Sequence, residues 1–124
     1  MNLVDSSGWV EYFLDGPQAN LFNSPLSDTR HLIVPSICIY EVFKTVLRER
    51  DESLALRSVV LMQQGLVVDF NSEIALEAAK LSYQLKLPAA DSIILATARK
   101  YHATIWTQDS DFENIENVKL IKKK

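Results

Sequence analysis

The stretch "LPAADSIILATARKYHATIWTQD", residues 87–109, joins a helix signal to a strand signal within one short segment. Pro88 suits the start of a helix, and the apolar residues three, four and seven positions after Asp91 share a helix face with it. We expect this helix to end near His102 and a strand, "TIWT", to follow at 104–107. Since an unpaired buried carboxylate costs several kcal/mol, Asp91 on that apolar face requires a partner.

The rest of the chain repeats this alternation of short β-like runs and longer helical ones. Ser6 and Ser7 are N-cap candidates for the first helix, Gly65 is expected at a helix C′ position, and a later helix is expected to be capped at 71 or 72. The expected strands are 2–5, 31–34, 66–70, 104–107 and 118–121, and the expected helices are 9–14, 36–50, 52–64, 72–85 and 88–102, with an uncertain helical piece at 17–27. Helices of this length between strands imply parallel pairing with right-handed crossovers. The predicted fold class is therefore α/β, a three-layer α/β/α sandwich with a central parallel sheet.

The composition indicates one globular domain over residues 1–124. The chain is 48% hydrophobic and 23% charged, and at this length one core needs no disulfide or structural metal. The single cysteine, Cys38, lies in an apolar run, which suits a buried structural thiol and a cytoplasmic protein. The N-terminus lacks the basic region of a signal peptide, and the apolar run 31–40 is too short to span a bilayer. We therefore expect neither export nor a membrane anchor.

Four acidic residues lie where this fold collects functional groups. Asp5 ends the first strand, and Asp109 follows the strand 104–107 after one residue. Glu41 and Asp91 lie early in helices, whose N-termini favour carboxylates. In an open parallel sheet, the carboxyl ends of the strands border the crevice in which ligands bind. We therefore predict that the four carboxylates converge at one edge of the sheet.

Each acid also has a purely structural explanation. Asp5 could cap the helix that follows it, and Asp109 could form an Asx turn. Glu41 could pair with Lys44 on the next turn, and Asp91 could accept backbone hydrogen bonds at its helix start. Together these explanations are weaker, because all four acids would have to reach one edge by coincidence.

Converging carboxylates require a cation. Two unit charges about 4 Å apart repel by about 4 kcal/mol at an effective dielectric constant of about 20. Oxygen donors without a nearby histidine or cysteine select Mg²⁺ or Mn²⁺ over Zn²⁺, and His31 and His102 are expected at the ends of elements, outside the site. Such a site is typical of phosphodiester hydrolysis or phosphoryl transfer. Because the chain has no P-loop, a nucleotide kinase or NTPase is disfavoured.

Four segments then occur in an order that is typical of a known family. They are "LVDSSGWVEYF" at 3–13, "PSICIYEVFK" at 35–44, "LPAADSIILATA" at 87–98 and "TIWTQDSDF" at 104–112. In this order the chain resembles the PIN-domain ribonucleases, and in particular the VapC-type toxins of toxin–antitoxin pairs. The resemblance covers essentially the whole chain.

The resemblance implies a set of site residues and partners. The catalytic acids would be Asp5, Glu41, Asp91 and Asp109, of which Asp5, Asp91 and Asp109 would bind metal. Supporting roles would fall to Ser6, Thr107 and Asp111, the last as a capping or supporting residue rather than the fourth acid. The implied activity is endonucleolytic cleavage of RNA by a water that one or two Mg²⁺ or Mn²⁺ ions activate. The implied partners are an antitoxin, whose C-terminal segment blocks the active-site groove, and a second copy of the chain in a homodimer.

The contacts with RNA follow from weaker signals. Neutralising four acids with metal would change the formal charge from −3 to −3 + 4 = +1, so Lys44, Arg48 and Arg50 are candidate RNA-binding residues. Trp9 and Trp106 could stack on bases, but their places in a helix and a strand favour core packing.

Three other functions are compatible with parts of the pattern. A PIN-like nuclease could process RNA without being a toxin, and a catalytically silent module could keep the fold for binding alone. A phosphoacceptor signalling domain would use Asp69 as its acceptor. That class needs a lysine after a late strand, where "TIWTQDSDF" supplies acids instead.

Overall fold

The sheet is parallel throughout, as the alternation of strands and helices predicts. The structure, a computed structural model, describes residues 1–123. Within that range the strands are β1 (Asn2–Val4), β2 (Leu32–Pro35), β3 (Leu66–Val68), β4 (Thr104–Thr107) and β5 (Val118–Leu120). They lie in the order β3-β2-β1-β4-β5, and every neighbouring pair is parallel. The central strand is therefore β1, with β4 on one side and β2 on the other.

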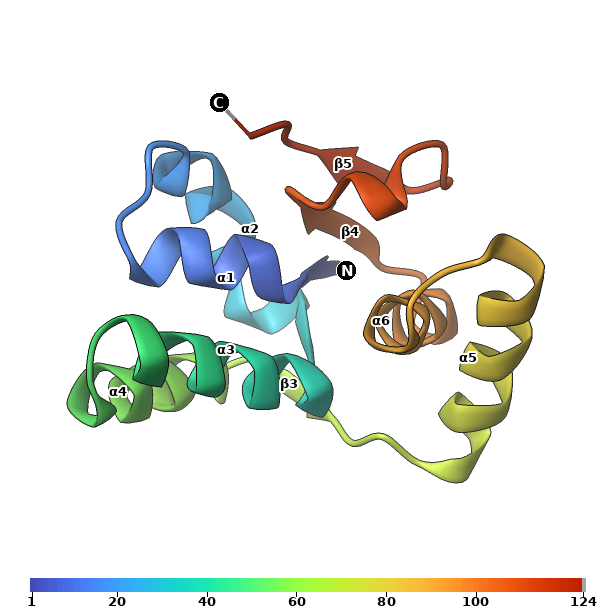
Figure 1. Cartoon of the computed structure of the whole chain (residues 1–124), viewed down its shortest axis with the longest axis horizontal. Helices are drawn as coiled ribbons and strands as arrows, with labels where there is room; N and C mark the ends of the chain where they lie inside the picture. The colour runs from blue at the N-terminus through green and yellow to red at the C-terminus, as the bar shows by residue number, and fades with distance from the viewer. Residues whose placement is uncertain (124) are drawn as a thin grey trace.

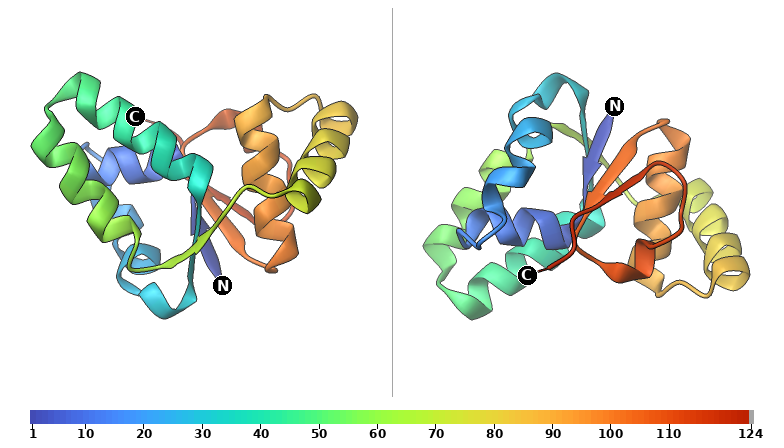
Figure 2. Two further views of the ribbon diagram at one scale, coloured as in Figure 1. Left: turned by 90° about the horizontal axis from the view of Figure 1, so that it is seen from below. Right: turned by 90° about the horizontal axis from the view of Figure 1, so that it is seen from above.

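Helices cover both faces of this sheet, which confirms the three-layer α/β/α sandwich. One face carries α1 (Ser6–Phe13), α2 (Asn23–Ser27), α3 (Ser36–Glu49) and α4 (Glu52–Met62), and the other carries α5 (Ser72–Leu85) and α6 (Ala89–Lys100) (Figures 1 and 2). Short 3₁₀ turns lie at η1 (Ala19–Phe22), η2 (Thr29–His31) and η3 (Ser110–Phe112). The predicted helical piece at 17–27 is therefore η1 followed by α2.

The core explains why two helical layers are needed. All four residues of β2 are buried, as expected for a strand covered on both faces. The helix α6 is buried from Ile94 to Ala98, because it lies between the sheet and α5. Trp9 and Cys38 are buried in this core, which confirms the structural role expected for each.

Two predicted helix caps are wrong. The N-cap of α1 is Asp5, whose side chain accepts a hydrogen bond from the backbone N–H of Gly8, and not Ser6 or Ser7. Gly65 does not have the left-handed conformation of a C′ glycine, and within residues 1–123 no glycine does. Instead, a Cβ at Gly65 would lie 2.9 Å from the carbonyl oxygen of Leu32, so this glycine permits the close approach of the chain to β2. The predicted cap at Asn71 is confirmed.

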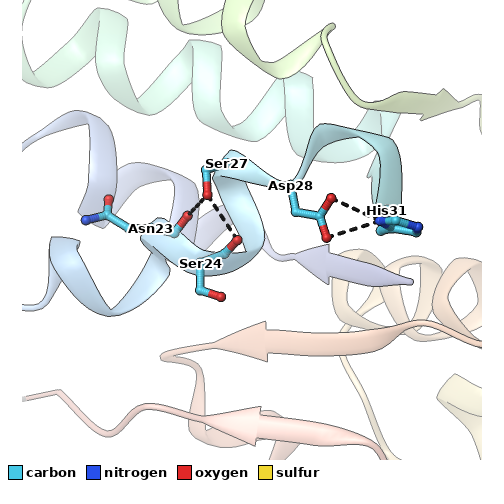
Figure 3. A network of polar contacts seen from close by, with 5 residues as sticks. All are labelled: Asn23, Ser24, Ser27, Asp28 and His31. Atoms are coloured by element: carbon cyan, nitrogen blue, oxygen red, sulfur yellow. Dashed lines mark hydrogen bonds and ion pairs between the residues drawn. The ribbon is translucent and has the colours of Figure 1, made fainter.

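The segment before β2 carries its own polar network, far from the acids. His31 Nδ1 lies 3.0 Å from Asp28 Oδ1, and the Ser27 hydroxyl donates to the carbonyl oxygens of Asn23 and Ser24 (Figure 3). Because His31 lies directly before β2, it is at the amino edge of the sheet. Both histidines lie at the ends of elements, as predicted. Among residues 1–123 no helix has the length and apolarity needed to cross a membrane.

The topology creates a switch point between β1 and β4. From β1 the chain steps to β2 and then to β3, whereas β4 and β5 lie on the other side of β1. Ligands of open α/β sheets bind outside the carboxyl ends of the strands at such a point. Asp5 and Asp109 follow the two strands that flank it.

Candidate metal centre

Asp5 is held rigidly at the end of β1. Its side chain is 3% exposed. Oδ1 accepts hydrogen bonds from the Ser7 hydroxyl at 2.7 Å and the Gly8 N–H at 3.1 Å, and Oδ2 accepts from the Thr107 hydroxyl at 2.5 Å. Burial raises the pKa of Asp5 to about 6, although these three hydrogen bonds oppose the shift. Asp5 is therefore both the helix cap considered above and a carboxylate at the switch point.

Thr107 connects Asp5 to Asp109. Its buried hydroxyl donates to Asp5 and accepts the backbone N–H of Asp109 at 2.9 Å. The Asp109 carboxylate in turn accepts the N–H of Asp111 at 2.9 Å and so caps η3. The Asx-type bond considered for Asp109 is therefore present, and it orients the acid without removing it from the edge.

Asp109 also belongs to a group of three converging acids. Asp91, Asp109 and Asp111 each offer a carboxylate oxygen, and these oxygens lie within 4.8 Å of one another. The pKa of Asp91 rises to about 8, first because of burial, then because of the charge on Asp109, the hydrogen bond and charge of Asp111, and the charge on Asp5. Asp91 comes from the first turn of α6, so the opening apolar stretch holds it against the loop after β4. Asp111 thus lies among the converging acids, closer to the centre than its predicted supporting role suggested.

Glu41 stands apart from this group. Its Oε1 accepts the Ser6 hydroxyl at 2.6 Å, which ties α3 to the first residue of α1. Its carboxylate is absent from the one set of three convergent ligands found in residues 1–123. The structure therefore brings together Asp91, Asp109 and Asp111, with Asp5 nearby. Glu41 contacts Ser6, the residue after Asp5, and is not one of the three converging acids.

Ser7 is a site residue that the sequence did not reveal. Its hydroxyl donates to Asp5, accepts the N–H of Gln108 at 3.0 Å and lies 3.4 Å from the Thr107 hydroxyl. The two adjacent serines differ only in where the first turn of α1 points them: Ser6 faces Glu41 and Ser7 faces Asp5. To predict this difference, one must know at which residue α1 begins, because that residue sets the direction of each side chain in the first turn. The predicted cap at Ser6 or Ser7 places that start one or two residues too late.

The donors fit a hard divalent cation. Carboxylate oxygens are the ligands that Mg²⁺ and Mn²⁺ prefer, and the convergent set contains neither histidine nor cysteine. Burial contributes most to the raised pKa of Asp91, and the charges on Asp109, Asp111 and Asp5 add repulsion that a bound cation would relieve. The geometry thus supports the cation expected from the sequence.

The three basic candidates lie along α3 and beyond it. Lys44 is exposed, with its ammonium 5.7 Å from the centre of the Tyr40 ring. Arg48 pairs with the neighbouring Glu49 at 3.2 Å, and Arg50 donates to the carbonyl oxygen of Leu14 at 3.4 Å. A helix as long as α3 spans about 20 Å, so Arg48 and Arg50 lie near the end remote from the carboxyl edge.

Asp69 lies outside this centre. It follows β3, which is the edge strand of the sheet, and not the central strand. A phosphoacceptor at Asp69 would therefore be separated from Asp5 and Asp109 by β2. This placement disfavours the signalling-domain alternative.

Several solved structures have the same fold. A toxin–antitoxin complex from Klebsiella pneumoniae contains a chain that is 21% identical, with a TM-score of 0.83 over 99% of this chain and 100% of that one. VapC20 of Mycobacterium tuberculosis, described as a toxin that cleaves the sarcin–ricin loop, is 13% identical, with a TM-score of 0.78 over 94% and 95%. A chain of VapBC2 from Rickettsia felis, solved bound to promoter DNA, is 16% identical, with a TM-score of 0.73 over 98% and 97%.

The comparison with sequence families is more specific. No curated protein sequence matches the chain. The family model of the PIN domain matches residues 3–118, a range that begins within β1, includes every acid discussed above and ends at the start of β5. The chain therefore belongs to the PIN-domain family.

Proposed function

We propose that this protein is a metal-dependent endoribonuclease and the toxin of a type II toxin–antitoxin pair. The observation that carries the proposal is the convergence of Asp91, Asp109 and Asp111 beside Asp5 at the switch point of a PIN domain. The similarity to VapC20 and to toxin–antitoxin complexes supports the toxin role.

Asp5, Asp91 and Asp109 are the ligands we assign to Mg²⁺ or Mn²⁺, with Asp111 as a further donor. Such an ion, when bound, polarises the scissile phosphate and lowers the pKa of a bound water. The chain supplies the geometry: Ser7 and Thr107 hold both oxygens of Asp5, and Thr107 also holds the backbone of Asp109. Asp91 would have to lose its proton to bind the ion, because burial and the neighbouring acids raise its pKa to about 8.

Glu41 has a separate catalytic role in this proposal. Ser6 engages one of its carboxylate oxygens, and we assign the other to orienting a water near Asp5. A carboxylate outside the convergent set has no metal ion competing for its oxygens, so its second oxygen is available to accept a proton. Loss of Glu41 should therefore reduce the rate of cleavage more than the affinity for metal.

Cleavage of RNA by the purified protein tests this function. We expect cleavage with Mg²⁺ or Mn²⁺, none in excess EDTA, and cleavage that is slower by about 10²- to 10³-fold in Asp91→Asn. Asp69→Asn is the matched control, since Asp69 is an exposed acid after the edge strand β3 and should cleave as wild type. Full activity in EDTA or in Asp91→Asn would refute the proposal, and a folded, metal-binding but inactive protein would favour the silent interaction module.

We propose the groove between α3 and α4 as the surface for the antitoxin. Its cavity of about 510 Å³ is lined by apolar side chains, with Lys44 as its charged member; the others are Ile39, Tyr40, Phe43, Leu47, Leu56 and Val59. Tyr40 and Leu56 remain 60% and 52% exposed. An amphipathic helix with an acidic residue facing Lys44 would cover these side chains.

Co-expression with the neighbouring reading frame tests this partner. We expect a small protein to co-purify with wild type and to be lost from Leu56→Glu. The homodimer is a second proposal, which light scattering of the isolated protein measures directly. If Leu56→Glu changes the mass of the isolated protein but not co-purification, the groove belongs to the second copy. A nuclease without any such partner would instead be an RNA-processing enzyme.

The substrate and the place of action complete the proposal. We propose RNA as the substrate and the cytoplasm as the location, in keeping with the single buried thiol of Cys38. Lys44 is the basic candidate nearest the start of α3, whereas Arg48 and Arg50 would contact only an RNA that extends along this helix. Substituting Lys44 and Arg50 separately by Gln, with KM as the readout, distinguishes them.

A further inference from the structure

Two buried glutamines link the candidate metal centre to the C-terminal segment. Gln18 and Gln108 are only 6% and 7% exposed. Gln108 Nε2 donates to Gln18 Oε1 at 2.8 Å, and Gln18 Nε2 donates to the carbonyl oxygen of Lys122 at 2.8 Å. Buried amides are costly unless they are paired, so this chain of hydrogen bonds fixes both side chains.

Gln108 lies between two residues of the centre, and its backbone is anchored as well. It separates Thr107 from Asp109, and its N–H donates to Ser7, which holds Asp5. The Gln108 side chain bonds Gln18, whereas its backbone N–H bonds Ser7. Both ends of Gln108 are therefore fixed where the chain leaves β4.

The partner Gln18 is itself held from two directions. Its backbone N–H donates to Glu11 Oε2 at 2.7 Å, which connects it to α1. The segment that carries Lys122 is tied to β4 by the Ile121 N–H, which donates to the Thr107 carbonyl oxygen at 2.8 Å. Gln18 thus joins α1, the end of β4 and the residues after β5.

We propose that Gln18 and Gln108 are positioning residues for the metal centre. Their hydrogen bond sets the direction of the chain after β4, and thereby where Asp109 and Asp111 present their carboxylates. Neither glutamine is assigned as a ligand. The proposal rests on the metal-dependent function proposed above, and it predicts that breaking the pair weakens cation binding without removing any donor.

Methionine substitutions test this directly, because methionine keeps the length of glutamine and lacks its amide. We expect Gln18→Met and Gln108→Met each to raise the Kd for Mn²⁺, measured by electron paramagnetic resonance, by about 10-fold, the lower end of the range for groups that orient ligands. The double variant should bind Mn²⁺ no more weakly than Gln18→Met, since Gln18→Met already removes the bond to Gln108 together with the bond to Lys122. Gln84→Met, an exposed glutamine on α5, is the matched control and should leave the Kd unchanged.

Cleavage at varied metal concentration separates positioning from general damage. A positioning defect shifts the Mn²⁺ concentration needed for half-maximal cleavage by about 10-fold, and the maximal rate is recovered at saturating Mn²⁺. A fold weakened at a distance would lower the rate at every metal concentration. Wild-type affinity in both methionine variants, or a rate lowered equally at all concentrations, would overturn the proposal.

Wild-type protein provides a readout that does not depend on whether the variants fold. In ¹⁵N NMR spectra, the side-chain amides of Gln18 and Gln108 should shift during a Mg²⁺ titration with the same midpoint as the backbone amide of Asp109. If the Asp109 amide resonance shifts and the two glutamine side-chain amide resonances do not, the positioning role is refuted and the metal-dependent function is not. If no resonance responds to Mg²⁺, the metal-dependent function itself fails.

Discussion

Asp5 and Asp91 are both carboxylates with raised pKa values, yet their surroundings differ. Asp5 is buried, and three hydrogen-bond donors from Ser7, Gly8 and Thr107 satisfy its oxygens. Asp91 faces other acids. Its burial and the charges on those acids both raise its pKa, to about 8, whereas the pKa of Asp5 is raised to about 6. Asp5 thus already has three hydrogen-bond partners within the protein before it contributes to a metal site, whereas the mutual repulsion of Asp91, Asp109 and Asp111 is relieved only by a cation.

Removing Asp91 should have the largest effect. We expect Asp91→Asn to lower RNA cleavage by about 10² to 10³-fold, on the scale of losing one group that stabilises transition-state charge. The metal-free variant should melt at a higher temperature than metal-free wild type, because asparagine needs neither the proton uptake nor the charge among acids that Asp91 requires in the folded state. Calorimetry in EDTA checks the second result, and an unchanged or lower melting temperature would show that Asp91 is a structural carboxylate.

Thr107 joins the two regions, so its loss should damage both. Thr107→Val removes the hydroxyl that donates to Asp5 and accepts from Asp109. We expect a loss of about 1–3 kcal/mol in the free energy of unfolding and a 10- to 100-fold (order of magnitude) weaker affinity for Mn²⁺. Thr107→Ser, which keeps the hydroxyl, is the control in urea unfolding and metal titration. Equal behaviour of the two variants would mean that the hydroxyl bonds do not matter.

The adjacent serines offer a finer comparison. Ser7→Ala removes a bond to Asp5 and should weaken Mn²⁺ binding by up to about 10-fold. Ser6→Ala removes the bond to Glu41 and should lower the rate of cleavage with little change in Mn²⁺ affinity. Isothermal titration and single-turnover kinetics measure the two quantities. The reverse assignment of effects would show that Glu41, and not Asp5, belongs to the metal centre.

The pH dependence of stability should show the same contrast at the scale of a few degrees. The folded metal-free protein keeps the Asp5 proton up to about pH 6 and the Asp91 proton up to about pH 8, whereas an unfolded chain loses both near 3.8. The folded state therefore binds more protons within these windows, and its stability falls as pH rises through them. Between pH 6 and 8 the fall belongs to Asp91, so Asp91→Asn should flatten it in thermal melts. A slope that survives in this variant would assign the titration to another group.

Much of this arrangement follows from the sequence, because hydrophobic periodicity shows where the helices and strands lie and their order along the chain restricts the topology. Parallel pairing follows from helices between strands, and the edge position of Asp5 and Asp109 follows from where their strands end. The pairing of β1 with β4 depends on long-range contacts, so the structure and not the sequence shows that these two strands are neighbours. The same limit explains why Asp111 was ranked below Asp109: the turn of η3 directs both carboxylates toward Asp91.

Smaller errors have local physical causes. The cap of α1 was predicted one or two residues late, because Ser6 and Ser7 are equally good cap residues and only the backbone shows that Asp5 is used. The sequence predicts Gly65 at a helix C′ position, whereas the close packing of the chain against β2 explains this glycine. Neither the roles of Ser7 and Gln108 nor the position of Glu41 has a sequence signal, because each depends on where a side chain points.

Proton release on metal binding shows whether a cation is the partner of the Asp91 carboxylate. If a cation is the missing partner of Asp91, Mn²⁺ binding at pH 7 should displace nearly one proton, because the carboxyl with a pKa of about 8 is mostly protonated before binding. Titration calorimetry in buffers of different ionisation enthalpy measures this number. We expect wild type to release close to one proton on binding Mn²⁺ at pH 7, and we expect Asp91→Asn not to release it. Tight Mn²⁺ binding without proton release, or with the same release in Asp91→Asn, would contradict it.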